Sequence, residues 1–167
     1  MGILSGNPKE EPLHYGEVIG CWSYAGANKG LISAYEAFIN HAGDKELIEL
    51  LREAVDMMKD ENKQVEKVLK ENGVTPPPTL PERANAKAED IPAGARFMDP
   101  EISAAVSINV GQGLVSCSQV IGQCIREDIA TMFSKFHAAR LLFGLKLLRL
   151  NKDKGWIIPP PLQTDTK

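Results

Sequence analysis

The sequence predicts an all-α protein, a single four-helix bundle domain over residues 1–167 with a long crossover between its second and third helices. Three observations predict this fold. Apolar residues recur at steps of three, four and seven in four long stretches. All eleven prolines lie outside the interiors of those stretches. Short connections join the first stretch to the second and the third to the fourth, which is typical of antiparallel helix pairs.

The first helix is expected over residues 13–42, along a stripe formed by Val18, Cys21, Ala25, Ile32, Tyr35 and Ile39. We expect Gly43 to adopt the left-handed conformation that often follows a helix, and Asp44 to cap the next one. The second helix is expected over 45–72, because Asn72-Gly73 and the prolines that follow prevent its continuation.

The crossover, residues 74–98, contains five prolines and no sustained apolar period. A connection of this length is unusual inside a compact domain. Spanning a bundle about 35–40 Å long would explain it. Pro-rich chain extends about 3.1 Å per residue, so the segment is long enough to do so.

The third helix is expected over 100–123, with Asp99 as its N-cap and Pro100 in the first position. A break at 124–126 is predicted, although no Gly or Pro marks it; the alternative is one helix of more than 50 residues, which is rare in small domains. The fourth helix is expected over 127–154, and residues 156–158 should fold back over the bundle end. The resulting up-down-down-up order is the ferritin-like connectivity.

Ferritin-like carboxylate proteins bind two metal ions through inward Glu residues and two Glu-x-x-His pairs. Those pairs are missing, because the second helix has no His and Ser134 precedes His137 by three residues. Polar residues still fall near the middle of the bundle: Asn28, Glu61, Asn109, Gln112 and His137. One interpretation is a structural polar core without cofactors. The alternative is that Glu61 and His137 bind a single divalent metal, or that the core binds a small ligand.

Composition excludes several classes of function. A net charge of −3 provides no basic surface for nucleic acid, and no run of about 18 apolar residues predicts a membrane span. The opening MGILSGNPKEE lacks the features of a signal peptide. Three cysteines indicate a reducing compartment and are expected to be buried structural thiols. Phosphate-loop, GxGxxG, GxSxG and CxxC motifs are absent from the sequence.

Five segments carry a resemblance to a known family: WSYAGANKGLISAYEAFINHAGDKEL, LKENGVTPPP, FMDPEI, REDI and GWIIPPP. The chain resembles uncharacterised ferritin-like proteins of spore-forming bacteria, described as spore coat proteins. The resemblance implies a ferritin-like bundle and a cytoplasmic or spore-associated location, and it supplies no catalytic residues. We therefore expect a non-catalytic structural or interaction protein that forms homodimers or binds coat-type proteins. The alternative is a divergent ferritin-like protein that binds a metal or small ligand.

Overall fold

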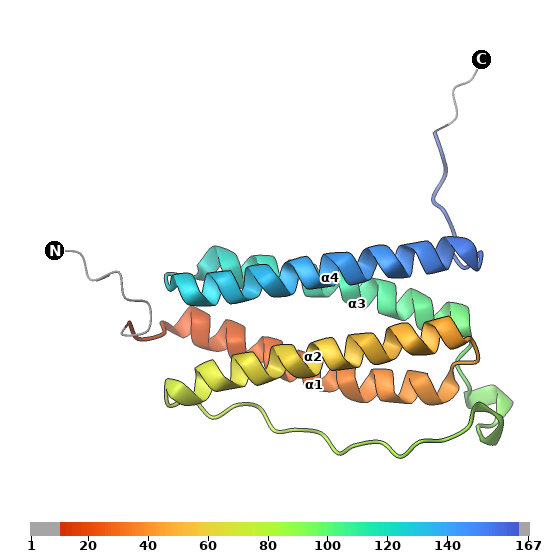
Figure 1. Cartoon of the computed structure of the whole chain (residues 1–167), viewed down its shortest axis with the longest axis horizontal. Helices are drawn as coiled ribbons and strands as arrows, with labels where there is room; N and C mark the ends of the chain where they lie inside the picture. The colour runs from red at the N-terminus through yellow and green to blue at the C-terminus, as the bar shows by residue number, and fades with distance from the viewer. Residues whose placement is uncertain (1–10, 164–167) are drawn as a thin grey trace.

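The computed structural model describes residues 11–163, which form four long helices and no strand. Figure 1 shows the helices lying alongside one another as a bundle. Their bounds are α1 Tyr15–His41, α2 Lys45–Glu71, α3 Asp99–Gln123 and α4 Glu127–Asp153; two short 3-10 turns, η1 Ala88–Asp90 and η2 Ala93–Ala95, lie in the crossover. The expectation about a signal peptide depends on the first ten residues, which lie outside the described part of the chain.

The topology confirms the predicted order of helix directions. α1 and α2 form one antiparallel hairpin and α3 and α4 form a second. The crossover runs back along the bundle, so α2 and α3 point the same way (Figure 1). Each helix end lies within two residues of its expected position.

The α1–α2 connection is stabilised by hydrogen bonds to Asp99 of α3, and Gly43 does not adopt the left-handed conformation that we expected. Only Gly73 and Gly155 have positive φ among the described residues, so the prediction for Gly43 is wrong. Asp44 does cap α2, as predicted: its carboxylate accepts the amides of residues 46 and 47 at 3.0 Å. Asp99 is not the N-cap of α3, which is Met98. Its carboxylate instead accepts the amides of Gly43 and Asp44, at 2.9 and 3.1 Å.

The predicted break between α3 and α4 is confirmed, and it is stabilised by a residue of α1, far away along the chain. Glu17, fully buried on α1, accepts the backbone amides of Ile125 and Arg126, both at 2.9 Å. Arg126 also forms a bidentate ion pair with Asp128 and donates to the side-chain oxygen of Asn72 at 3.1 Å. These contacts supply partners for amides that a continuous helix would have used, so no Gly or Pro is needed.

The crossover is hydrogen-bonded to α1 along much of its length. Lys29 donates to the carbonyl of Pro77, and Arg83 donates to the carbonyl of Ser33 at 2.9 Å. Further contacts join Trp22 to Thr75, Asn40 to Ala84 and Ala86, and His41 to Phe97. The crossover therefore covers the α1–α2 hairpin as an ordered extended segment.

The described C-terminal segment departs from our expectation. Trp156 packs against the core and Ile157 lies against α3 and α4. Beyond them the chain does not fold back, because Ile158 is 95% exposed and the three prolines are exposed. Figure 1 shows this segment projecting away from the bundle. The prediction that residues 156–158 cover the bundle end holds for the first two residues only.

Candidate functional site

A cluster of four buried polar side chains lies between the two apolar halves of the bundle core. We call it the polar centre: Tyr24 and Asn28 of α1, Glu61 of α2 and Arg140 of α4. Glu61 is 2% exposed and Arg140 is 4% exposed, and their side chains pair at 2.6 Å. Burial of this kind requires that the two opposite charges neutralise each other.

The hydrogen bonds of the polar centre converge on one carboxylate oxygen of Glu61, Oε2, whereas its Oε1 is buried without a partner in the described residues. Oε2 of Glu61 accepts from the Tyr24 hydroxyl at 2.9 Å, from the Asn28 amide at 3.1 Å and from Arg140. Arg140 donates in addition to the Tyr24 oxygen at 2.8 Å and to the Asn28 carbonyl oxygen at 2.9 Å. Its guanidinium also lies 5.2 Å from the centre of the Tyr24 ring. Three helices are thereby joined through polar contacts at one level of the bundle.

Space for the guanidinium comes from a glycine on α3, the helix that contributes no side chain to the polar centre. A Cβ atom on Gly113 of α3 would lie 2.6 Å from Nη1 and 3.0 Å from Cδ of Arg140. No larger residue fits there unless Arg140 moves. Gly113 therefore permits α3 to close over the polar centre.

Burial changes the protonation behaviour of this cluster. It raises the pKa of Glu61, although Arg140 and the hydrogen bonds from Tyr24 and Asn28 oppose the shift. Burial likewise raises the pKa of the Tyr24 hydroxyl, so tyrosine remains a hydrogen-bond donor at neutral pH. The arrangement holds the Glu61 carboxylate through one oxygen, Oε2, which accepts from three donors.

The predicted mid-bundle residues are only partly brought together. Asn28 and Glu61 are bonded, whereas Asn109 is half-buried and Gln112 is exposed. These two amides line a groove of about 410 Å³ between α1 and α3, together with Asn28 and Arg140. His137 is half-buried, and its side chain forms no hydrogen bond or ion pair with the described residues.

The donor set at the polar centre does not suit a metal ion. Among residues 11–163, no group of three or more His, Cys, Asp and Glu side chains is arranged to hold one. The partner of Glu61 is Arg140, about one helical turn beyond His137 on α4, and its positive charge would repel a cation. Metal binding by Glu61 and His137 stays a prediction that elemental analysis can test.

Sequence reasoning missed Tyr24 and Arg140. A signal for Arg140 was present, because it lies seven residues after Phe133 and seven before Leu147, both buried core residues. A charged residue in register with the core is therefore a candidate for a buried ion pair. Tyr24 occupies the corresponding position on α1, three residues after buried Cys21 and four before Asn28.

The three cysteines carry no disulfide, and Cys21 and Cys117 are buried, as expected. Cys124 is partly exposed. Burial, the largest cause, raises the pKa of Cys21 to about 12 and that of Cys124 to about 11. Thiols with such pKa values are weak nucleophiles at neutral pH.

A second feature of the surface is the outer face, which we define as the exposed apolar residues of α3 and α4: Ile108, Val115, Leu141, Leu145 and Leu148. Residues 102–125 contain no charged side chain. A hollow lined by Val110 of α3 and by Gly144 and Leu148 of α4 joins the two helices on this side. The outer face therefore has exposed apolar members on both helices, and Leu148 lies at the hollow where α3 and α4 meet.

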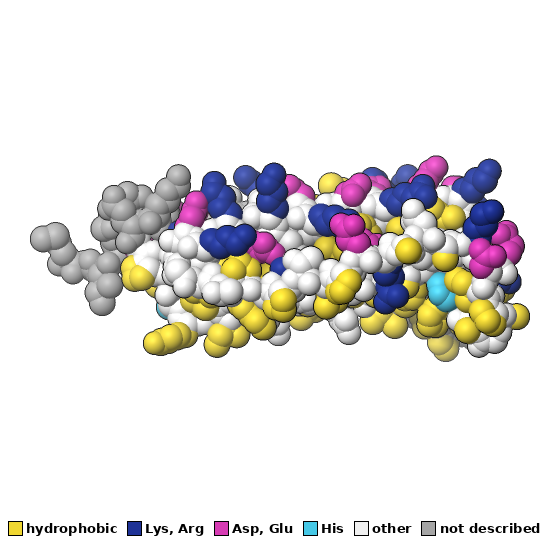
Figure 2. Space-filling model, turned by 90° about the horizontal axis from the view of Figure 1, so that it is seen from below, with side chains coloured by type: hydrophobic (Ala, Val, Ile, Leu, Met, Phe, Trp, Pro, Cys, Tyr) yellow, Lys and Arg dark blue, Asp and Glu magenta, His cyan; other side chains and the backbone are white. Residues whose placement is uncertain are grey.

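The segment Ala93–Gln123, which includes α3, is long and apolar enough to cross a membrane by length and composition alone. Core helices of soluble proteins meet the same criterion, but only 28% of this apolar window is buried. Figure 2, which views the molecule from the side of α1, α2 and the crossover, shows charged groups gathered along one long edge and hydrophobic groups along the other. Exposed apolar residues on a stretch without charged side chains, here residues 102–125, are characteristic of an interaction surface.

Comparison with known families adds a finding that covers the whole chain. The family described as "Protein of unknown function (DUF3231)" matches residues 1–167. The chain belongs to this family. A DUF3231 relative, the uncharacterized protein YvdQ of Bacillus subtilis strain 168, is 54% identical over 162 residues, covering 97% of this chain and 95% of YvdQ.

Two solved structures are similar to this DUF3231 protein. One is a "putative spore coat protein" from Bacillus halodurans C-125, with 58% identity and a TM-score of 0.94 over 95% of this chain and all of that one. The other is a conserved hypothetical protein from Mycobacterium tuberculosis, with 12% identity and a TM-score of 0.64 over 83% of this chain and 98% of that one. The first supports family and fold together, and the second shows the fold alone.

Proposed function

We propose that this DUF3231 protein is a non-catalytic, spore-associated structural protein that pairs with a second copy of itself through the outer face. The observation that carries the proposal is the outer face itself. The part of α3 after its first turn has no charged side chain, and its exposed Ile108 and Val115 accompany exposed leucines of α4. The description of the 58%-identical Bacillus halodurans protein supports the spore association.

The polar centre supports the absence of catalysis and of a core metal. In the ferritin-like arrangement the middle of the bundle holds inward carboxylates and histidines. Here Arg140 fills the corresponding region and engages Glu61. We infer that this protein retains the connectivity of a ferritin-like bundle and uses an ion pair, in place of metal ligands, to join its helices.

Self-association through the outer face is tested with Leu145→Lys. The substitution places a charge on the outer face, where its burial against a second copy would be unfavourable. In dilute solution, sizing chromatography with light scattering should give twice the 18.3 kDa chain mass for the wild type, and mainly the single-chain mass for the variant. Tyr15→Lys, at an exposed aromatic residue at the start of α1, is the matched control and should remain dimeric.

A wild-type protein that stays monomeric at high concentration would contradict the proposal. Elemental analysis of untagged native protein tests the second part, because stoichiometric iron, manganese or zinc would count against a metal-free bundle. Immunoblotting of fractions from a sporulating Bacillus host tests the location. The protein should be enriched in purified spores relative to vegetative cells.

A further inference from the structure

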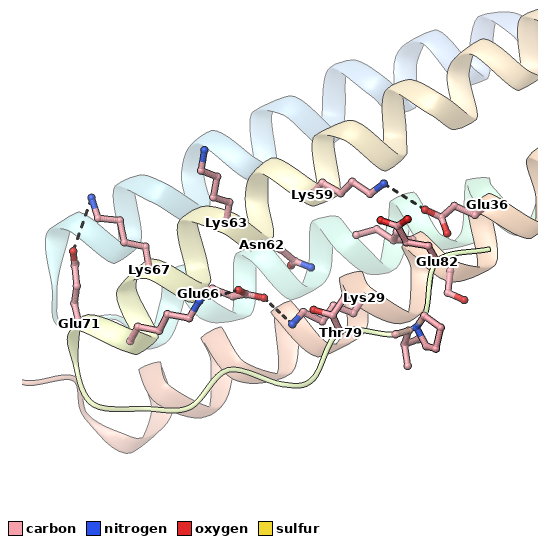
Figure 3. A pocket seen from close by; sticks show the side chains of 15 residues that line it. Lys29, Glu36, Lys59, Asn62, Lys63, Glu66, Lys67, Glu71, Thr79 and Glu82 are labelled. Atoms are coloured by element: carbon pink, nitrogen blue, oxygen red, sulfur yellow. Dashed lines mark hydrogen bonds and ion pairs between the residues drawn. The ribbon is translucent and has the colours of Figure 1, made fainter. Parts of the chain in front are cut away.

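A groove of about 470 Å³ lies between α1, α2 and the crossover (Figure 3). Ile32 of α1, Leu80 and Pro81 of the crossover, and the aliphatic stems of lysines on α2 make its wall largely apolar. It follows α2 from Lys59 to Glu71, which is about 18 Å at 1.5 Å per residue. We call it the crossover groove.

A buried polar side chain in this groove has no partner within the described residues. Asn62 is 5% exposed, and both its amide nitrogen and its amide oxygen lack hydrogen bonds within the described chain. Figure 3 shows its side chain beneath α2, directed into the hollow. A buried amide without partners is less stable than an apolar side chain of similar size. Its presence therefore indicates an occupant that offers both a donor and an acceptor.

The cover of the groove can open without losing hydrogen bonds. The crossover is fastened to α1 at Pro77 by Lys29 and at Arg83 by the Ser33 carbonyl. Between these two points, no hydrogen bond of the described structure involves residues 78–82. Those five residues include the groove-lining Leu80 and Pro81, so their displacement would expose Asn62.

The described C-terminal segment has the properties that such a groove requires. Ile158 is 95% exposed and Leu162 is 74% exposed, with three prolines between them. Proline favours the extended polyproline conformation and leaves backbone carbonyls without a neighbouring N–H competitor. Residues 158–163 span about 16 Å at 3.1 Å per residue, which is close to the length of the groove. We call residues 158–163 the tail.

We propose that the crossover groove binds the tail of a second copy of this chain. The Asn62 amide group donates to a backbone carbonyl of the tail and accepts a backbone N–H from Leu162 or Gln163. Ile158 and Leu162 bury their side chains against Ile32 and Leu80. The proposal rests on the assembly role given above and adds a second contact to it. Because tail and groove are different surfaces, the contact is heterologous and can repeat from copy to copy.

A synthetic peptide of residues 157–163, IIPPPLQ, tests the contact directly. It is titrated into the full chain carrying Ile158→Asp and Leu162→Asp, so that no intact tail competes. We expect saturable binding that Asn62→Leu weakens at least about tenfold, which corresponds to the loss of about 1.4 kcal/mol. Asn109→Leu, in the other groove, is the matched control and should leave binding unchanged. A peptide with Asp in place of both Ile158 and Leu162 should not bind.

Thermal unfolding without peptide provides a second readout. Asn62→Leu should raise the melting temperature, because it removes an unsatisfied buried amide and retains the packing. A lower melting temperature would show that Asn62 is a satisfied structural residue and would overturn the proposal. Undiminished peptide binding by Asn62→Leu would overturn it as well.

Sizing over a range of concentrations separates this proposal from the outer-face dimer. The tail variant should stop at the dimer, whereas the wild type should form larger assemblies. Leu145→Lys should abolish the dimer and still bind the peptide. If the peptide binds but the wild type never exceeds a dimer, the groove accepts the tail of its own chain. That outcome would refute the second-copy contact and leave the outer-face proposal intact.

Discussion

The guanidinium of Arg140 lies against the backbone of α3 at Gly113, where a methyl group would sit 2.6 Å from Nη1 and 3.2 Å from Cζ. Three hydrogen-bonding partners hold the guanidinium in place, so it cannot withdraw without breaking contacts with Tyr24, Asn28 or Glu61. The closeness of α3 to the other helices therefore depends on one glycine and one arginine.

Gly113→Ala should reduce the free energy of unfolding by about 1–3 kcal/mol, since displacement of Arg140 outweighs the gain of about 1 kcal/mol in helix propensity. Gly111→Ala is the control on the same helix, because nothing lies within 4 Å of its added Cβ. It should stabilise the protein by up to about 1 kcal/mol. Urea denaturation of both variants measures the difference, and equal stabilisation by both would contradict the packing described here.

Arg140→Met should be among the most destabilising substitutions in the bundle. It leaves the Glu61 carboxylate buried without its cation, at a cost of roughly 3–5 kcal/mol. Adding Glu61→Leu should recover much of that loss, because the remaining charge is removed. A double-mutant cycle by chemical denaturation provides the coupling energy. Additive effects of the two substitutions would show that the pair is not coupled.

The stability of the protein should depend on pH through Glu61. Burial raises the pKa of this carboxyl in the folded state above its ordinary value of 4.5, so folding favours the protonated form. The stability that this group contributes is therefore fully present below pH 4.5 and is lost as pH rises through the folded-state pKa. The dependence should be larger in Arg140→Met, which lacks the opposing charge, and should disappear in Glu61→Gln. Unfolding curves at several pH values measure it.

Glu17→Ala should loosen the connection between α3 and α4. The substitution leaves the amides of Ile125 and Arg126 without their acceptor, and each unsatisfied buried donor costs about 1–3 kcal/mol. Hydrogen exchange should accelerate at these two amides and remain slow in the middle of α2. Unchanged exchange at residues 125 and 126 would contradict the assigned role of Glu17.

The thiols should react slowly in the folded protein. The pKa values of Cys21 and Cys124, raised to about 12 and about 11, leave little thiolate at pH 8. Partly exposed Cys124 should react first with a disulfide reagent, and all three cysteines should react rapidly in denaturant. Fast labelling of Cys21 under native conditions would show that the α1 stripe is not packed as described.

Local signals in the sequence were sufficient for the four helices and the direction of each. The carboxylate of Asp44, the Asn72-Gly73 ending and the proline-rich crossover act on neighbouring residues, so they can be recognised without coordinates. The α3–α4 break is different in origin. It depends on Glu17, 109 residues away from Arg126 along the chain, and no local pattern reports such a contact.

The sequence predicted that polar residues meet near the middle of the bundle, but it identified only two of the four residues of the polar centre. Glu61 and Asn28 stood out because polar residues interrupted apolar stripes. Arg140 did not, because a charged residue in an amphipathic helix is ordinarily expected to face solvent. Its seven-residue spacing from Phe133 and Leu147 is the stronger criterion, since it places the side chain in the core whatever its charge.

The length of the crossover has a consequence for how the gene could be divided. Each hairpin is closed by its own short connection, and the crossover ties the first hairpin to the second without forming part of either. A cut in residues 78–82 would break no hydrogen bond of the described structure and would yield two polypeptides, each with a complete helix pair. When they are co-expressed, the two halves should reassemble into one bundle. Two intact chains could also exchange hairpins, and the crossover of each chain would then connect the two bundles of a domain-swapped dimer.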